Sequence, residues 1–597
     1  MTRLIYMVCA ALAAGTAAGA PTAETAQRIQ RVEQGLLPQV LIKGETPPVK
    51  YLTARMAELK VPCVSIAVIH EGRIEWARGY GARFIGGPAV DEQTLFQAAS
   101  ISKPVFALAV LHQVDAGKLD LDTHVNDYLK SWKLPDNDFT REQKVTLRRM
   151  LSHTAGLTVH GFPGYGAADK LPTTVQILDG APPANTNPIR VDILPGSRHR
   201  YSGGGYTLAQ LVLTDVTGEP LDKLLRDTVL TPLGMSLSTF QQPLPGSRLA
   251  EFAMPYRGDG TAVPGGPHVH PEVAAAGLWT TPSDLARYAL GVIDALKGKS
   301  KILSAKTARM MVTPHVGVHG LGPVSGGKTD RKYFTHGGSN AGYRCLLVAY
   351  EDGEGAVIMT SGDNGGELME EVIRGIAHVY QWPDFAPPVR TVAAVEPEAL
   401  EKLIGVYELE EKSLFVVRRN GRRLLGHIVG HAAAEMLPSA QNELFAREYD
   451  VTVKFETDAS GAATSVRHQM YDRKRAGKRV DEARARRVLA SIERSEQRVR
   501  EQKPDPRADA AIRKLIVGVA GGNPDYESMN AQLADITRQQ LKGLQGWFGS
   551  LGTLKTLDFQ KVRDNGADLY LAKFDKGEVV IEAGLGEDGR FEMINLR

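Results

Sequence analysis

The chain has few cysteines, almost no net charge and no apolar run long enough to cross a membrane. Lysine and arginine (71) nearly balance aspartate and glutamate (68), so the formal net charge is only +3. No block of basic residues is dense enough to bind nucleic acid, and we expect no nucleic-acid partner. The 597 residues include only three cysteines. A chain of this length is too long for one hydrophobic core and should form two to four domains.

The N-terminal apolar stretch predicts a signal peptide over residues 1–20 and no transmembrane segment. Arg3 supplies the positive charge that precedes the apolar core of such peptides. That core, residues 4–14, is too short to span a bilayer, and residues 18–20 read Ala-Gly-Ala, a typical cleavage site. Cys9 lies too early in this segment to be a lipoprotein cysteine. We therefore expect a protein that is exported to a bacterial periplasm or secreted.

Several common functional motifs are missing or incomplete. No Gly-x-Ser-x-Gly sequence occurs, which removes the usual signal of an α/β-hydrolase. Residues 322–329 match the Walker A spacing and leave a P-loop protein as an alternative, but residues 330–334 follow where a helix would be required. His268 and His270 have no third metal ligand at a clear spacing. Residues 584–589 match a dinucleotide fingerprint in spacing but indicate a hairpin turn. We expect neither a metal nor a cofactor.

The most informative segment that is present is residues 96–103, Phe-Gln-Ala-Ala-Ser-Ile-Ser-Lys. It places Ser100 three residues before Lys103, at the start of an apolar helix predicted over residues 105–114. A serine hydroxyl needs a nearby base to act as a nucleophile, and residues i and i+3 share one helix face. The helix N-terminus adds partial positive charge where an oxyanion would form. The segment predicts Ser100 as a nucleophile with Lys103 beside it.

Other segments supply possible partners for this serine. Tyr201 precedes a helix that should end at Gly218, and a phenol beside a lysine can accept or relay a proton. Residues 336–339, His-Gly-Gly-Ser, precede a predicted strand, and the backbone N–H of Ser339 can complete an oxyanion hole with that of Ser100. Each residue alone also fits a core tyrosine or a histidine in a surface turn. A second Ser-x-x-Lys, at 325–328, has no helix after it, so we expect no catalysis there.

Together these segments resemble the three motifs of the class C β-lactamase and penicillin-binding-protein family of serine hydrolases, Ser-x-x-Lys, Tyr-x-Asn and Lys/His-x-Gly. The resemblance spans residues 33–382, and residues 64–80, 145–157 and 274–288 look like further stretches of that family. It implies an α/β fold, with an antiparallel sheet flanked by helices plus a helical lobe.

The resemblance also implies roles for individual residues. Ser100 would form an acyl-enzyme, and Lys103 and Tyr201 would share the general base and acid work. The substrate and its oxyanion would lie against the third motif, which consists of His336, Gly337, Gly338 and Ser339. The strands that carry Cys63 and Cys345 would not be neighbours in the sheet, so we expect two buried thiols instead of a disulfide.

Two departures from the family pattern bear on specificity. Gly203 stands where the tyrosine motif has asparagine, and His336 stands where many members have lysine. Histidine is mostly neutral at pH 7, so a fixed charge that suits a carboxylate is absent. We therefore expect a small-molecule or peptide substrate with an ester or amide bond. A β-lactamase or DD-carboxypeptidase remains the alternative, as does a non-catalytic binding protein. The oligomeric state and the exact substrate are left open.

The last 200 residues predict further modules without recognisable chemistry. A proline-rich linker at 382–388 precedes short strands, and Asn420-Gly421 is a strong hairpin signal between two of them. This pattern resembles the small β-barrel often appended to such hydrolases, at 390–480. A highly charged helix at 481–502 follows, and then an α+β module at 508–597.

Overall fold

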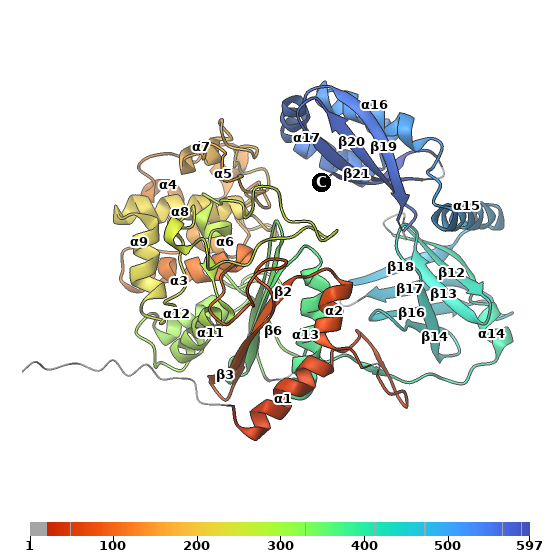
Figure 1. Cartoon of the computed structure of the whole chain (residues 1–597), viewed down its shortest axis with the longest axis horizontal. Helices are drawn as coiled ribbons and strands as arrows, with labels where there is room; N and C mark the ends of the chain where they lie inside the picture. The colour runs from red at the N-terminus through yellow and green to blue at the C-terminus, as the bar shows by residue number, and fades with distance from the viewer. Residues whose placement is uncertain are drawn as a thin grey trace, which may run out of the picture.

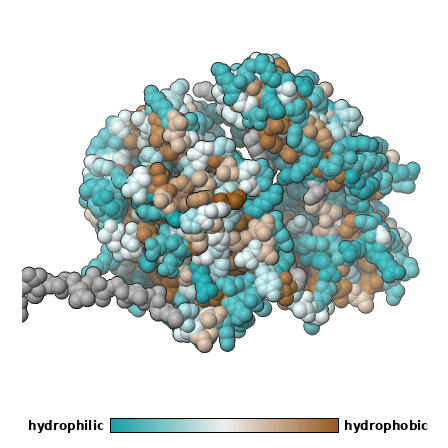
Figure 2. All heavy atoms as spheres, in the orientation of Figure 1, coloured by the Kyte–Doolittle hydropathy of each residue, from teal (hydrophilic) through white to brown (hydrophobic). Residues whose placement is uncertain are grey.

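The computed structural model describes residues 21–47, 49–328, 330–410, 413–470, 473–563, 565–586 and 588–596. The predicted signal peptide and Cys9 lie outside these ranges. Among the described residues, no helix is both long and apolar enough to cross a membrane. Hydrophilic residues cover most of the face shown in Figure 2, and apolar residues appear there in scattered patches.

A six-stranded antiparallel sheet forms the centre of the first domain (Figure 1). Its strand order is β3-β2-β9-β8-β7-β6. The strands are β2 (Cys63–His70), β3 (Arg73–Gly81), β6 (Val324–Gly326), β7 (Tyr333–Asn340), β8 (Tyr343–Tyr350) and β9 (Gly355–Ser361). Residues 64–80, which resemble a stretch of the family, thus form the hairpin of β2 and β3, and the expected antiparallel sheet is confirmed.

Both faces of this sheet are buried, which explains the nearly continuous apolar sequence of β2. Val64, Ile66 and Val68 pack with α1 (Ala23–Gln34), α2 (Leu52–Glu58) and α13 (Gly365–Val379). On the opposite face, the alternate residues Cys63, Ala67 and Ile69 join the larger core that contains α3 (Ser102–Asp115) and α11 (Pro282–Leu296). Since successive side chains point to opposite faces, a strand between two helical layers must be apolar on both.

The helical lobe surrounds α3, whose residues are buried almost all round, as its apolar sequence predicts. It includes α8 (Gly203–Thr217), which ends at Gly218 with φ of +69°, a left-handed conformation that glycine adopts readily. The other helices of this region are α4 (Val125–Tyr128), α5 (Asp138–Glu142), α6 (Leu147–Leu151), α7 (Thr174–Asp179), α9 (Leu221–Leu225), α10 (Val273–Ala276) and α12 (Ala305–Val312).

The two described cysteines are buried free thiols. Cys63 lies in β2 and Cys345 in β8, and β9 separates these two strands in the sheet. Burial raises the pKa of the Cys63 thiol to about 12, so the thiol is protonated at neutral pH. The prediction of two buried thiols without a disulfide is confirmed.

A closed barrel of eight antiparallel strands follows, in agreement with the resemblance of this region to a small appended β-barrel. Its strands are β11 (Gly405–Leu409), β12 (Leu414–Asn420), β13 (Arg423–Ile428), β14 (Ala434–Ala440), β15 (Glu443–Ala446), β16 (Val451–Thr457), β17 (Ala463–Met470) and β18 (Arg473–Arg479). The charged helix α15 (Glu482–Glu501) packs Val488 and Ile492 against Val406 and Val416 of the barrel.

The connection to the barrel is more ordered than its proline content predicts. The side chain of Trp382 is buried against the ring of Tyr350, and Asp384 accepts a hydrogen bond from the Tyr350 hydroxyl. Further on, β10 (Val389–Arg390) pairs in parallel with β1 (Leu41–Ile42). The segment at 382–388 therefore packs on the first domain instead of running free between domains.

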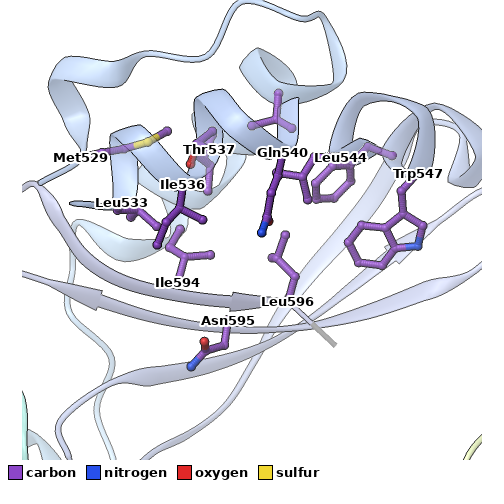
Figure 3. Close-up of a pocket in the computed structure, with 13 residues that line it drawn as sticks. Met529, Leu533, Ile536, Thr537, Gln540, Leu544, Trp547, Ile594, Asn595 and Leu596 are labelled. Atoms are coloured by element: carbon purple, nitrogen blue, oxygen red, sulfur yellow. The ribbon is translucent and has the colours of Figure 1, made fainter. Parts of the chain in front are cut away.

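The last module is a four-stranded antiparallel sheet with two helices. Its strands are β19 (Leu554–Val562), β20 (Asp568–Phe574), β21 (Glu578–Leu585) and β22 (Phe591–Leu596), and its first helix is α16 (Ala508–Ala520). An open groove of about 570 Å³ lies beside β22, and Ile536 and Gln540 point into it from α17 (Ala531–Leu551) toward Ile594 and Leu596 (Figure 3). None of the described residues that line this groove is charged.

Candidate active site

Ser100 and Lys103 form a close pair at the N-terminal end of α3. Ser100 lies in the 3-10 turn η1 (Ala99–Ile101), which leads directly into the helix. The Lys103 Nζ donates to the Ser100 Oγ at 3.0 Å and to the backbone carbonyl of Ala275 at 2.8 Å. The lysine side chain is buried while Ser100 stays partly exposed. The lysine is thus fixed by α10 on one side and reaches the serine hydroxyl on the other.

Tyr201 lies over this lysine, immediately before α8. The Lys103 Nζ is 4.9 Å from the centre of the Tyr201 ring, within the range of a cation–π contact. The helix start behind the tyrosine is capped by Ser202, whose Oγ accepts the backbone N–H of Gly205 at 3.0 Å. The structure therefore brings together the three residues that the sequence nominated for catalysis.

His336 lies in strand β7, not in a surface turn. Its side chain is buried, and its Nδ1 donates to the carbonyl of Gly337 at 2.6 Å. Its ring centre is 6.4 Å from that of Tyr201. Burial, and then the charge of Lys103, lowers the pKa of His336 to about 3, so the imidazole is neutral at pH 7. The site has no permanent positive charge at this position.

The glycines after His336 allow β7 to approach the serine turn closely. A Cβ on Gly338 would lie 2.2 Å from the carbonyl oxygen of Ala98, a distance that no side chain tolerates. Only glycine permits this contact between the strand and the turn that carries Ser100. Ser339 follows on the same strand and is exposed. Its proposed share in an oxyanion hole remains a prediction.

The structure gives a physical reason for Gly203 in the tyrosine motif. A Cβ at this position would lie 3.0 Å from the Phe162 ring and 3.1 Å from the carbonyl oxygen of His160. The Gly203 N–H also donates to that carbonyl at 2.9 Å. The loop that carries Phe162 therefore fills the space into which the asparagine of the family pattern would project.

The sequence analysis missed a group of histidines around Tyr201. Their ring centres lie 4.2 Å (His153) and 4.8 Å (His160) from that of Tyr201. Behind them, His199 stacks on His319 at 3.7 Å. Burial is the largest cause of the lowered pKa of all four imidazoles. They come from three separate segments, so no local pattern in the sequence could have shown that they meet.

The second Ser-x-x-Lys lies in a different setting. Ser325 is in β6, and its Oγ donates to the carbonyl of Val312. The backbone N–H of Lys328 donates to Asp384. The described residues on either side belong to β6 and β7, with no helix between them, so the helix that a P-loop requires is not found there.

The described residues include no group of three or more histidine, cysteine or acidic side chains arranged to hold a metal ion. His268 donates to the carbonyl of Pro163, whereas His270 is fully buried and neither of its ring nitrogens has a hydrogen-bond partner among the described residues. The two histidines that resembled a metal pair in the sequence thus have different surroundings.

The sheet, the helical lobe and the serine–lysine pair define a serine hydrolase with the β-lactamase fold. The chain belongs to the Beta-lactamase family, whose model matches residues 49–381. Penicillin-binding protein 4 of Amycolatopsis lactamdurans is 28% identical over 381 residues, which cover 60% of this chain and 96% of that protein. Esterase EstB of Burkholderia gladioli is 36% identical over 216 residues, 34% of this chain and 52% of that protein.

A putative D-alanyl-D-alanine carboxypeptidase of Escherichia coli (strain K12) is 26% identical over 265 residues, covering 41% of this chain and 58% of that protein. Among solved structures, the octameric penicillin-binding protein homologue from Pyrococcus abyssi is 22% identical, with a TM-score of 0.49 over 72% of this chain and 98% of that chain. The family match ends at residue 381 and includes neither the barrel nor the last module.

Proposed function

We propose that this protein is an exported serine hydrolase that cleaves an ester or peptide amide bond through an acyl-enzyme on Ser100. The observation that carries the proposal is the hydrogen bond of 3.0 Å from the Lys103 Nζ to the Ser100 Oγ, at the N-terminal end of a buried helix. A serine hydroxyl becomes nucleophilic when a neighbouring group can take its proton. Lys103 is the group that touches it.

The reaction proceeds in two halves. The Ser100 Oγ attacks the substrate carbonyl and passes its proton toward Lys103 and Tyr201, while the N–H groups of Ser100 and Ser339 hold the oxyanion. The tetrahedral intermediate collapses, the leaving group takes that proton, and the acyl group stays on the serine. A water molecule then attacks the acyl-enzyme by the same path, and Ser100 recovers its proton as the acid is released.

The neighbours of the site favour substrates without a carboxylate. His336 is neutral at pH 7 and cannot supply the fixed charge of a lysine. Gly203 lacks the asparagine amide, and Phe162 occupies the space beside it. An esterase is among the relatives, so an ester or a peptide amide is the proposed target. A β-lactamase or DD-carboxypeptidase activity is the second candidate, favoured by the penicillin-binding-protein relatives.

Export remains part of the proposal because the apolar segment at 4–14 and the Ala-Gly-Ala at 18–20 fit a signal peptide. A non-catalytic binding protein is the alternative from another class.

The purified protein should hydrolyse p-nitrophenyl acetate or D-alanine p-nitroanilide with a higher kcat/KM than nitrocefin, and Ser100→Ala should abolish turnover of all three. A kcat/KM for nitrocefin more than about tenfold above that of the other substrates would favour the β-lactamase. Tenfold is about the effect expected from the loss of one hydrogen bond to a charged group. No turnover of any substrate and no covalent labelling would favour the binding protein.

A further inference from the structure

His153 contacts Tyr201 and both of its neighbours in the chain. The Arg200 N–H donates to the His153 carbonyl at 2.8 Å, and the Ser202 N–H donates to the His153 Nδ1 at 3.1 Å. Between these two hydrogen bonds, the imidazole lies against the Tyr201 ring, with 4.2 Å between the ring centres and 31° between the planes. One residue therefore fixes the backbone on each side of the tyrosine and one face of its ring.

The histidine itself is held in an unusual conformation. Its φ is +58°, in the left-handed region, which is uncommon for residues other than glycine although histidine, asparagine and aspartate adopt it more often than the rest. Such a backbone costs of order 1 kcal/mol and persists only where the surroundings enforce it. His153 follows Ser152, the C-cap residue of α6, and its N–H donates to the carbonyl of Met150 in that helix. This conformation turns the imidazole toward Tyr201.

The imidazole is nine-tenths buried and is not used by the proposed reaction. Its exposure is 3%, and its Nε2 has no hydrogen-bond partner among the described residues. Since Nδ1 accepts the Ser202 N–H, the single proton of the neutral ring is on Nε2. Burial and the charge of Lys103 keep the pKa of His153 well below its usual range. The ring stays neutral, so it does not repel the lysine.

Other rings close the space behind His153. His199 and His319 meet its ring edge-on, with 5.9 Å and 6.2 Å between ring centres, and Tyr206 contacts it at 5.3 Å. The imidazole is therefore packed on several sides and cannot move away from Tyr201 without displacing them.

We infer that His153 is a positioning residue that fixes the orientation of the Tyr201 phenol over Lys103. The inference rests on the proposed function, because it assumes that Tyr201 takes part in proton transfer. The Lys103 Nζ lies 4.9 Å from the centre of the Tyr201 ring, and a rotation of the phenol would change this distance. Misplacement of a reacting group by about 1 Å can cost 100-fold in rate.

The test is a double-mutant cycle with His153→Asn and Tyr201→Phe, assayed with p-nitrophenyl acetate. Asparagine tolerates the left-handed backbone and keeps an acceptor near the Nδ1 position, so the change removes mainly the ring contact. His153→Asn should lower kcat about tenfold and change KM less than about twofold. In the Tyr201→Phe background it should lower kcat less than about twofold further, because the hydroxyl that the ring positions is already gone.

His270→Asn is the matched control, because His270 is also a fully buried histidine with a lowered pKa but has no ring contact with Tyr201. It should leave kcat within about twofold of the unmodified protein. Losses that multiply in the double mutant, an unchanged kcat in His153→Asn, or an equal loss in His270→Asn would overturn the positioning role alone. A Tyr201→Phe protein with full kcat would overturn the proton path of the proposed function, and the role of His153 with it.

Discussion

Glu272 gives a prediction whose size can be worked out from the structure. The residue immediately precedes α10, the helix whose Ala275 carbonyl holds Lys103. Its side chain is fully buried, and neither carboxylate oxygen has a hydrogen-bond partner among the described residues. Burial raises the pKa of Glu272 from 4.5 to about 7. The folded protein therefore keeps this proton at pH values where the unfolded chain has lost it.

The sign of the effect follows from proton linkage. At pH 4.5 and below, the carboxyl is mostly protonated in both states, and the raised pKa costs little. As the pH rises from 4.5 to 7, the unfolded state ionises first, and the free energy of unfolding falls by about 3 kcal/mol. Above pH 7 the loss is complete and no longer grows. Glu272→Gln removes the ionisation and should remove this loss.

The assay compares urea unfolding of the Glu272→Gln and unmodified proteins at pH 4.5 and pH 8.5. Both carry Trp547→Phe, so that fluorescence follows only the first domain, which contains the other four tryptophans, Trp76, Trp132, Trp279 and Trp382. When buried here, the glutamine amide and the protonated carboxyl are both left without hydrogen-bond partners. The change in the stability difference between the two proteins from pH 4.5 to pH 8.5 therefore reports only the ionisation of Glu272. Glu272→Gln should be about 3 kcal/mol more stable at pH 8.5 and nearly equal at pH 4.5. A gain below about 1 kcal/mol between the two pH values would refute the reasoning.

The remaining predictions concern specificity and export. Gly203→Asn should destabilise the protein by about 1 to 3 kcal/mol in chemical unfolding, because its side chain meets Phe162 and the His160 carbonyl, and Phe162→Ala should restore part of the loss; equal stability of Gly203→Asn would contradict this. His336→Lys should raise the nitrocefin to p-nitrophenyl acetate ratio of kcat/KM by at least about tenfold, and an unchanged ratio would show that this position does not select carboxylates. Mass spectrometry of the exported protein should find a start at or near Pro21 without a lipid. An uncleaved chain, or a chain with a lipid on Cys9, would contradict the predicted cleavage.

How much of the site could be predicted from the sequence depended on how far apart in the chain the contacting residues lie. Ser100 and Lys103 are three residues apart, so helix geometry alone places one beside the other. Tyr201 was a candidate because a phenol can relay a proton and because its segment resembles a family motif, but nothing local in the sequence connects it to α3. His153 reaches Ser202 across 49 positions, and its partners come from further segments. Contacts of that kind are set by tertiary packing, which periodicity in the sequence does not record.

The same limit applied to the fold. The strands of the sheet and barrel were predictable because their apolar residues are bounded by clear turns such as Asn420-Gly421. Taken alone, His336 also fitted a surface turn, yet it lies in β7, where Gly338 approaches Ala98 closely. The segment at 382–388 was expected to be a linker because of its prolines, but Trp382 is buried against Tyr350. In both cases a tertiary contact overrides local preference.

The most direct test of the central claim is the intact mass of the protein after reaction with a fluorophosphonate. Ser100 should carry one adduct, and Ser100→Ala should carry none, because its hydroxyl is the one that Lys103 contacts. Ser325→Ala is the matched control, since Ser325 also precedes a lysine by three residues but its hydroxyl donates to the Val312 carbonyl. That variant should be labelled as fully as the unmodified protein. An adduct that persists on Ser100→Ala, or that disappears from Ser325→Ala, would contradict the assignment of Ser100 as the nucleophile.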